Sequence, residues 1–485
     1  MAASRSGGSG QGSGGTSRRS GRPDAAAREA ARLLDLRKRM REVEEAILAR
    51  TPEHDLEPSL DRIQAVMELL GDPQRTYPSI HITGTNGKTS TARIIEAILR
   101  ETGLKTGRFT SPHLHSIRER VSIAGEPISE EAFIRAYDEV IPFIEMVDAQ
   151  SAQTGAPQMT YFEVVVALAY AAFADAPIDI AIVEVGMGGA WDATNVIDAD
   201  VAVITPVDID HTRFLGTTPE EIADEKVGII KPGAVVVSAL QPHEDVWEII
   251  RARAGEVDAR LVGEGVDFGI LTREVAVGGQ LLSLRGLAGD YENLVLSLWG
   301  AHQAQNAAVA VTAVEAFLGG GTQLIDHGVL TAALLAVESP GRLEIVRRSP
   351  TVLVDAAHNP HGMAALREAM SDSFTFTRLV GVVAIFADKD AAEMLEILEP
   401  VLDHVVVTRT ASSRATPPET LGQLAAEIFG DHRVTVVRDL PDALDVAAGL
   451  ADESGEGGGV GGGVLATGSV VTAAEVRMLL GVTSV

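Results

Sequence analysis

Residues 84–91 have the sequence Gly-Thr-Asn-Gly-Lys-Thr-Ser-Thr, a composition suited to binding phosphate. They follow a short apolar run at 79–83 and precede a helical pattern at 91–100 that stops at Gly103. A glycine turn between a strand and a helix presents backbone N–H groups and the positive end of the helix dipole to an anion. Lys88 adds a charge, and a hydroxyl after it can reach the Mg²⁺ that accompanies ATP. The pattern predicts an ATP site formed by Gly84, Thr85, Asn86, Gly87, Lys88, Thr89 and Ser90.

The loop differs from the standard Walker pattern, because Ile82 occupies the position of the first glycine. Two interpretations are open: a chance turn containing glycine and lysine, or a distinct subclass of phosphate-binding loop. The apolar strand before it and the helix after it favour the subclass.

Three further residues are candidates for catalysis. Glu184 ends an apolar segment just before a glycine-rich turn, and the carboxyl ends of parallel strands are where ligands bind in α/β sheets. A carboxylate there suits Mg²⁺, although a strand-end glutamate facing solvent is the alternative. We expect Asp210-His211 to end another strand, with Lys226 following in a helical segment. Alone, His211 is more often a structural histidine and Lys226 a helix-surface lysine; Glu184 and the loop give them weight.

The elements that position these residues alternate between apolar runs and helical patterns. Runs at 179–185, 200–205 and 234–238 predict a mostly parallel sheet with helices on both faces. A second alternation after Pro340-Gly341 predicts a smaller doubly wound domain, with strands at 351–354, 379–385, 404–408, 433–437 and 464–467. Residues 258–298 alternate apolar with polar, which predicts antiparallel strands at the edge of the first domain. We expect a disordered tail at 1–23, a first domain at 24–338 that opens with a charged helix at 24–50, and a second domain at 339–485.

Composition limits the number of domains and the classes of partner. A chain of 485 residues is too long for one ordinary core, so two or three domains are expected. A net charge of −28 argues against nucleic-acid and anionic-membrane partners, and most simply it maintains solubility. The absence of cysteine excludes disulfides, thiol nucleophiles and thiolate metal sites. No run of eighteen apolar residues occurs, and residues 1–21 lack the apolar core of a signal peptide, which predicts a cytoplasmic enzyme.

Taken together, these motifs resemble those of folylpolyglutamate synthase and dihydrofolate synthase, members of the Mur-type ATP-dependent amide ligases. The resemblance covers the chain from about residue 55 to the C-terminus. It rests on the Gly-Thr-Asn-Gly-Lys loop, Thr110-Ser111-Pro112-His113-Leu114, residues 184–195, Asp210-His211 with Lys226, and Asp355-Ala356-Ala357-His358-Asn359-Pro360. It implies an α/β fold, with an N-terminal P-loop ATPase-like domain on a mostly parallel sheet and a smaller C-terminal Rossmann-like glutamate-ligase domain.

The reaction that the resemblance implies is formation of an amide at the expense of ATP. ATP converts the carboxylate of dihydropteroate or of a tetrahydrofolate into an acyl phosphate, which the amino group of L-glutamate attacks. Relatives of the bacterial type often accept both acids, so a bifunctional enzyme is expected, and monomers are usual. Such phosphoryl transfer depends on positioning and charge neutralisation, the roles expected of Lys88 and two magnesium ions.

The resemblance also assigns residues. The first Mg²⁺ is expected at Glu184, Ser111 and the hydroxyl of Thr89 or Ser90, and His211 is expected to help hold the second. Lys226 matches a lysine that relatives carry as a carbamate; if unmodified, it is structural or faces phosphate. The resemblance places further nucleotide contacts at Asn306, Arg342, Asp355 and His358. The alternatives there are a linker arginine for Arg342 and a surface turn for His358.

Substrate contacts are expected at Thr160, Phe162, Lys389, Ser413 and Arg414, although Phe162 could equally be core. One departure is Ala190-Trp191, where relatives often have a basic and then an apolar residue.

Two functions are alternatives to the folate ligase. A Mur ligase of cell-wall synthesis shares the loop but usually carries an additional N-terminal domain, for which the segment before residue 79 is too short. A non-catalytic nucleotide-binding protein would be signalled by replacement of Glu184, His211 or Lys226, and all three are present.

Overall fold

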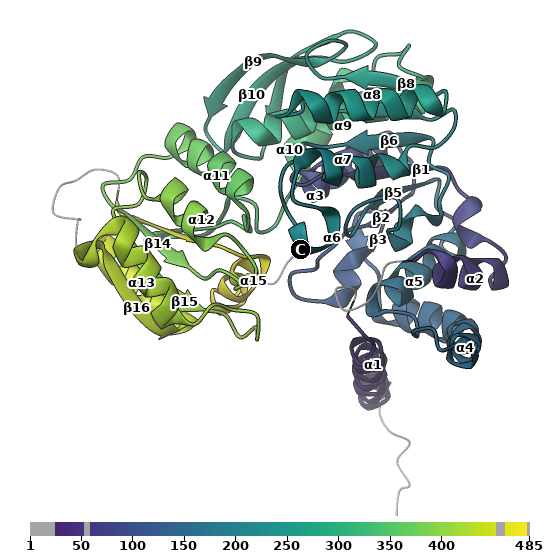
Figure 1. Ribbon diagram of the computed structural model, residues 1–485, viewed down its shortest axis with the longest axis horizontal. Coiled ribbons are helices and arrows are strands. Elements are labelled where there is room, and N and C mark those ends of the chain that lie inside the picture. Colours follow the sequence, from purple (N-terminus) through teal and green to yellow (C-terminus); the bar gives the residue numbers. More distant parts are fainter. Residues whose placement is uncertain (1–24, 53–58, 453–460, 483–485) are drawn as a thin grey trace, which may run out of the picture.

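The computed structural model describes residues 25–52, 59–452 and 461–482. Figure 1 shows two α/β units side by side, the larger one built from the first two thirds of the chain and the smaller one from the rest. This architecture confirms the predicted fold class. The predicted disordered tail at 1–23 lies outside the described residues, and the division at residues 338 and 339 stays a prediction, with one large sheet on either side of it.

The first unit is built on a sheet of eight strands in the order β4-β3-β2-β5-β1-β6-β7-β8. The strands are β1 (Ser79–Thr83), β2 (Thr106–Phe109), β3 (Val121–Ile123), β4 (Glu126–Pro127), β5 (Ile180–Glu184), β6 (Val201–Ile204), β7 (Val235–Ser238) and β8 (Arg260–Gly263). Pairing is parallel from β2 to β8, and β3 and β4 add an antiparallel edge. Because β1 lies in the middle of the sheet, the loop that follows it lies at the centre of the ligand-binding edge.

Helices cover both faces of this sheet. They are α1 (Ala25–Leu48), α2 (Asp61–Leu69), α3 (Lys88–Glu101), α4 (Glu130–Thr154), α5 (Tyr161–Asp175), α6 (Thr212–Leu215), α7 (Pro219–Lys226), α8 (Glu244–Glu256), α9 (Ala301–Gly319) and α10 (His327–Ala336). Successive strand residues point to opposite faces, so Ile80 and Ile82 pack with α3, α9 and α10, whereas Ala181 and Val183 pack with α5. The described helices include none whose length and continuous apolar character suit a membrane span.

The prediction of antiparallel strands for residues 258–298, at the edge of the first domain, is confirmed for three of the four strands in the segment and is wrong for the first. Its first strand, β8, pairs in parallel with β7 in the main sheet. The others, β9 (Gly269–Ala276), β10 (Gly279–Arg285) and β11 (Asp290–Leu296), form a separate antiparallel sheet whose apolar side chains share a core with α9 and α10. Figure 1 shows this small sheet at the top of the larger unit.

The second unit contains a six-stranded sheet in the order β12-β13-β17-β14-β15-β16, parallel except for β12. Its strands are β12 (Glu344–Arg348), β13 (Thr351–Val354), β14 (Leu379–Val383), β15 (His404–Arg409), β16 (Val434–Asp439) and β17 (Gly463–Thr467). Its helices are α11 (Pro360–Ser373), α12 (Ala391–Leu398), α13 (Pro418–Phe429), α14 (Leu440–Asp452) and α15 (Val470–Leu479). The first three share one apolar core and the last two another, on opposite faces of the sheet, as a doubly wound domain requires.

One histidine of the central strand makes stability depend on pH. His81 is fully buried, with Nε2 2.9 Å from Thr194 Oγ1, and burial together with the charge of Lys231 lowers its pKa to about 3. The unfolded chain binds a proton at this side chain below about pH 6.5 and the native state does not, so stability is lost as pH falls through this range.

Between about pH 7.5 and about pH 5, His81 alone is expected to lower the free energy of unfolding by about 2 kcal/mol. Urea unfolding at both pH values measures this change in wild type and in His81→Gln, which lacks the titrating group, and the difference between the two proteins is the contribution of His81. Equal pH dependence in the two proteins would contradict the prediction.

Candidate active site

A cavity of about 690 Å³ lies between the two units. Every residue predicted to bind nucleotide or metal, or to act in catalysis, lines it. They are Gly84, Thr85, Asn86, Gly87, Lys88, Thr89, Ser90, Ser111, Glu184, His211, Lys226, Asn306, Arg342, Asp355 and His358. Their roles stay predictions, but residues separated by up to 274 positions meet in one place.

The phosphate-binding loop joins β1 directly to α3. Gly87, with φ of 90°, precedes the helix in a left-handed conformation, so α3 begins at Lys88 and not at Thr91 as predicted. Thr85 ties the loop to the chain after β6, since its N–H donates to the Pro206 carbonyl at 2.9 Å and its hydroxyl to the Asp208 carbonyl at 2.8 Å. The chain segment after β6 therefore anchors the loop, in addition to β1 and α3.

Gly84 lies so close to β6 that no side chain fits. Its φ is 142°, and a Cβ there would lie 1.9 Å from Thr205 Oγ1 and 2.9 Å from the Thr205 carbonyl oxygen. We expect Gly84→Ala to destabilise the fold by about 3 kcal/mol, through strain and displacement of the loop, and to abolish nucleotide binding.

Gly71→Ala is the matched control, because Gly71 also has positive φ, 78°, but a Cβ there meets nothing within 4 Å. Chemical denaturation of both variants separates the backbone strain from the clash. Equal losses of stability in the two would contradict the role given to the contact with Thr205.

Two lysines, Lys226 buried and Lys88 half-buried, share one acceptor in this loop. The Gly84 carbonyl oxygen accepts from Lys88 Nζ at 2.9 Å and from Lys226 Nζ at 2.9 Å. Burial, followed by the charge of Lys88, lowers the pKa of Lys226 to about 7, and burial also lowers the pKa of Lys88. At neutral pH a substantial fraction of Lys226 is therefore a neutral amine, which is nucleophilic, in contrast to the ammonium of an exposed lysine.

Glu184 lies across the loop from Lys88 and is 1% exposed. Its hydrogen bonds within the described chain come from neutral groups: Thr89 Oγ1, at 2.9 and 3.0 Å from the two carboxylate oxygens, and Ser111 N at 3.3 Å. Burial raises the pKa of Glu184, against the opposing charge of Lys88. A buried carboxylate supplied mainly with neutral partners, beside hydroxyl oxygens, is a donor set that suits a hard divalent cation.

The described residues contain no group of three or more His, Asp or Glu side chains arranged to hold a metal unaided. This fits Mg²⁺, which typically takes one or two carboxylates and completes its shell with phosphates and water. The two hydroxyls after Lys88 point to different partners. Thr89 bonds Glu184, whereas Ser90 Oγ lies 3.0 Å from Ser339 Oγ and accepts from Gln303 Nε2 at 3.2 Å.

The prediction that Asp210-His211 end a strand is wrong. β6 ends at Ile204, and Pro206 has no N–H to continue a ladder, so a loop of several residues intervenes. His211 precedes α6 with a left-handed φ of 51°. The His211 side chain is 44% exposed, and its partial removal from water lowers its pKa, against the neighbouring Asp210 carboxylate, so the imidazole is neutral near pH 7.

The second unit supplies the other wall of the cavity from the loop after β13. The buried Asp355 carboxylate accepts from Leu343 N at 2.8 Å and Ala357 N at 2.8 Å, and so orders the segment that carries Arg342. His358 Nδ1 lies 2.9 Å from the Ala356 carbonyl oxygen. Across the cavity, Asn306 on α9 lies against Gly87, where a Cβ would meet Asn306 Oδ1 at 2.6 Å.

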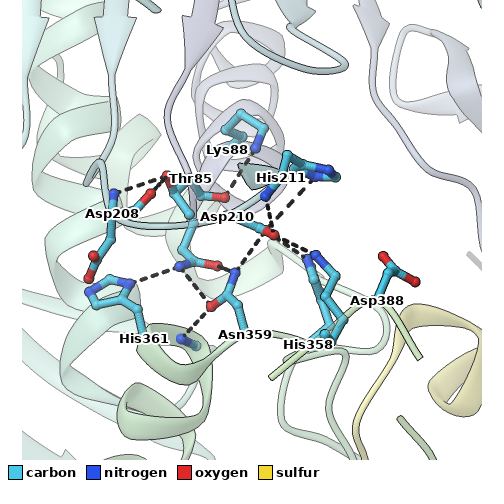
Figure 2. Close-up of polar contacts among 12 residues, drawn as sticks. Thr85, Lys88, Asp208, Asp210, His211, His358, Asn359, His361 and Asp388 are labelled. Atoms are coloured by element: carbon cyan, nitrogen blue, oxygen red, sulfur yellow. Dashed lines mark hydrogen bonds and ion pairs between the residues drawn. The ribbon is translucent and has the colours of Figure 1, made fainter. Parts of the chain in front are cut away.

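Direct hydrogen bonds join the two units at the phosphate-binding loop, as Figure 2 shows. The Asn86 and Asn359 side chains bond each other twice at 3.2 Å, and Asn86 Nδ2 lies 2.8 Å from His361 Nδ1. Asn359 Nδ2 also donates to Asp210 Oδ2 at 3.1 Å. Asn359, His361 and Asp210 were given no role from the sequence, although each lies within three residues of a residue that was.

The five residues predicted to bind substrate do not line the cavity. Thr160 caps α5, and Phe162 is 5% exposed with its ring 5.9 Å from that of Phe109, consistent with the core alternative. Arg414 pairs with Asp388 and stacks 4.7 Å over Phe386. Their assignment to substrate stays a prediction, as do those of Lys389, which pairs with Asp210, and of Ser413.

Comparison with known proteins identifies the family. The Mur ligase middle domain matches residues 82–314, and the Mur ligase glutamate ligase domain matches residues 341–469. The dihydrofolate synthase/folylpolyglutamate synthase of Mycobacterium tuberculosis is 49% identical over 456 residues, 91% of this chain and 93% of the relative.

Solved structures of the same family have the same fold as this chain. The Mycobacterium tuberculosis folylpolyglutamate synthase complexed with ADP and AMPPCP superposes with a TM-score of 0.87 at 48% identity, covering 92% of this chain and 99% of the other. An FPGS–AMPPCP–folate complex superposes with a TM-score of 0.76 at 28% identity, covering 91% and 99%. The two matched domains, the shared fold and the identity along nearly the whole length show that this chain belongs to the dihydrofolate synthase/folylpolyglutamate synthase family of Mur ligases.

Proposed function

We propose that this protein is an ATP-dependent ligase that joins L-glutamate to a pterin-linked carboxylic acid through an acyl phosphate. The observation that carries the proposal is the meeting of the phosphate-binding loop, Glu184, Lys226 and the Asp355–His358 loop around one cavity between the two units. The similarity to enzymes of this activity, one of them solved with AMPPCP and folate, supports it.

The loop positions the nucleotide and neutralises its charge. The first N–H groups of α3 and the loop amides face the phosphates, and Lys88 can exchange its two carbonyl acceptors, at 2.9 and 3.2 Å, for a phosphate oxygen. Arg342 enters the cavity from the other unit, so charge is supplied from both sides of the transferred group. This arrangement promotes phosphoryl transfer by preorganisation, without a covalent enzyme intermediate.

Magnesium would be held by Glu184 with Thr89 or Ser90 and the Ser111 hydroxyl, and a second ion by His211. When bound it neutralises phosphate charge and polarises the transferred phosphoryl group. The neutral fraction of Lys226 suits carbamate formation, in which the amine would add to dissolved CO₂ and release a proton. The carbamate would replace a cation near the metals by an anionic oxygen ligand.

The finer assignments belong to this proposal as well. We propose that both dihydropteroate and tetrahydrofolates serve as acceptors, that two magnesium ions take part, and that the protein acts as a cytoplasmic monomer. Thr160 and Phe162 are proposed to lie near the pterin, and Ser413 and Arg414 near the incoming glutamate.

A phosphate-release assay tests the proposal. Dihydropteroate and tetrahydrofolate are each offered with and without L-glutamate, in the presence of ATP and Mg²⁺. Release that requires both an acid and glutamate is expected, and product mass should increase by one glutamyl residue. Release independent of glutamate with either acid would overturn the ligase assignment, and release with one acid alone would overturn bifunctionality.

A further inference from the structure

Asp210 lies at the boundary of the two units, on the loop between β6 and α6. Its side chain is 8% exposed, and one of its carboxylate oxygens accepts the His211 N–H at 2.8 Å. Three donors come from the other unit: Lys389 Nζ forms a hydrogen-bonded ion pair, Asn359 Nδ2 donates at 3.1 Å, and His358 Nε2 lies 3.5 Å away. The imidazole of His211, in the same unit, lies 3.9 Å from the carboxylate. Figure 2 shows His211, His358 and Asn359 around the Asp210 carboxylate.

The Lys389 side chain reaches Asp210 from the loop after β14 and is only 10% exposed. An ion pair buried to this degree differs from the solvated surface pairs that contribute little, because removal of one partner leaves a charge unpaired away from water. Its geometry therefore favours the arrangement in which the two units are in contact.

Asn359 connects this ion pair to the phosphate-binding loop. One side-chain amide donates both to Asp210 Oδ2 and to Asn86 Oδ1, at 3.1 and 3.2 Å. Asp210 is followed directly by His211, which lines the cavity. The carboxylate thus joins three parts: the loop of the second unit that carries His358, the loop that carries Lys389, and the phosphate-binding loop.

We propose that Asp210 is a positioning residue for the ligase reaction, and that Lys389 acts by pairing with it and not by binding the amino-acid substrate. The pair holds the second unit against the phosphate-binding loop, so that His358 and Arg342 reach the nucleotide. The proposal rests on the proposed function and adds the element that keeps the two halves of the site together.

The experiment is a double-mutant cycle on the full chain, with Asp210→Asn, Lys389→Met and the double variant. We expect each single variant to lower kcat by about 10- to 100-fold, because small misplacement of reacting groups has effects of this size. ADP affinity should fall by less than kcat does, since the phosphate-binding loop keeps its own supports and only the contacts of His358 and Arg342 are weakened. The double variant should be no slower than the slower single variant, as expected for two residues that act through one contact.

Asp372→Asn is the matched control. Asp372 also forms an ion pair between the units, with Arg273, but it is 38% exposed and does not line the cavity. It should leave kcat unchanged, as expected of an exposed ion pair.

A second readout reports the contact itself. The chain has no cysteine, so cysteines introduced at the exposed positions Arg251 and Glu427 accept a fluorescence donor and acceptor, one on each unit. Transfer efficiency with ADP and Mg²⁺ should be high in wild type and Asp372→Asn, and reduced in Asp210→Asn and Lys389→Met. This readout holds even if wild type shows no glutamate-dependent turnover, so failure of the proposed function is distinguishable from failure of this inference.

Two results would overturn the inference. A raised KM for glutamate in Lys389→Met, with normal kinetics and transfer efficiency in Asp210→Asn, would make Lys389 a substrate ligand. Multiplying effects in the double variant, without change in transfer efficiency, would mean that the two residues act independently.

Discussion

Lys226→Met is expected to lower glutamate-dependent turnover by about 100- to 1000-fold, the range seen when one preorganised electrostatic group is removed. The nucleotide should still bind, because the loop amides and Lys88 are unchanged. The variant should fold, since methionine keeps the length of the stem and removes a buried amine whose charged form is already disfavoured.

Steady-state phosphate release and calorimetric titration with ADP measure the two expectations separately. Lys231→Ala is the control, a lysine five positions further on that does not line the cavity and bonds the Asn195 carbonyl oxygen at 3.1 Å. Turnover in Lys226→Met within tenfold of wild type would remove Lys226 from the mechanism. Isotope-labelled bicarbonate adds a chemical test, because a carbamate resonance is expected in wild type and not in Lys226→Met.

Glu184→Gln is the second change with a large expected effect, again about 100- to 1000-fold on turnover, because it removes the buried carboxylate proposed to hold Mg²⁺. Its effect on stability should have the opposite sign from most core substitutions. Burial raises the pKa of Glu184, which means that the native environment disfavours its ionised form. A neutral side chain of the same shape avoids that cost, so the Tm should stay unchanged or rise by about 2 °C.

Glu96→Gln, on α3, provides the contrast to this change at the end of β5. The buried Glu96 carboxylate accepts from Arg108 Nε at 2.6 Å, so its loss leaves an arginine unpaired in the core. Here the free energy of unfolding should fall by about 3 kcal/mol. Differential scanning calorimetry compares the two, and a lower Tm in Glu184→Gln than in Glu96→Gln would contradict the assignment of Glu184 to function over structure.

Local patterns were sufficient for most of the fold. Buried strands such as β1 and β5 are short continuous apolar runs, and the helices of the second unit follow clear amphipathic patterns, so both sheets were predicted in outline. The errors arose where long-range pairing decides. Residues 260–263 begin a segment predicted to form antiparallel strands, yet they pair in parallel with β7, which no local pattern specifies. Asp210-His211 follow an apolar run, but Pro206 ends the ladder earlier.

Some residues of the candidate site could likewise be predicted from local sequence, and others could not. Residues on one loop or at one strand end, such as Lys88 and Glu184, were identified because residue type and local context suffice. The ion pair between Asp210 and Lys389 joins positions 179 residues apart. Both residues lie in segments that the family resemblance includes, but nothing in either segment indicates that the two side chains pair. Such contacts depend on how two units dock, a property of their surfaces and not of local periodicity.

The hydrogen bond between Ser90 and Ser339 has a mechanical consequence. Ser339 belongs to the segment between α10 and β12 that connects the units, and it touches the first turn of α3, beside Lys88. A body that swings about a pivot moves least near the pivot and most at its far end. Rotation of the second unit about this connection would hardly move the phosphate-binding loop, whereas the loop that carries Lys389 would move further. Such a rotation would open the cavity for the acid and its lengthened product while the phosphate-binding loop keeps its arrangement.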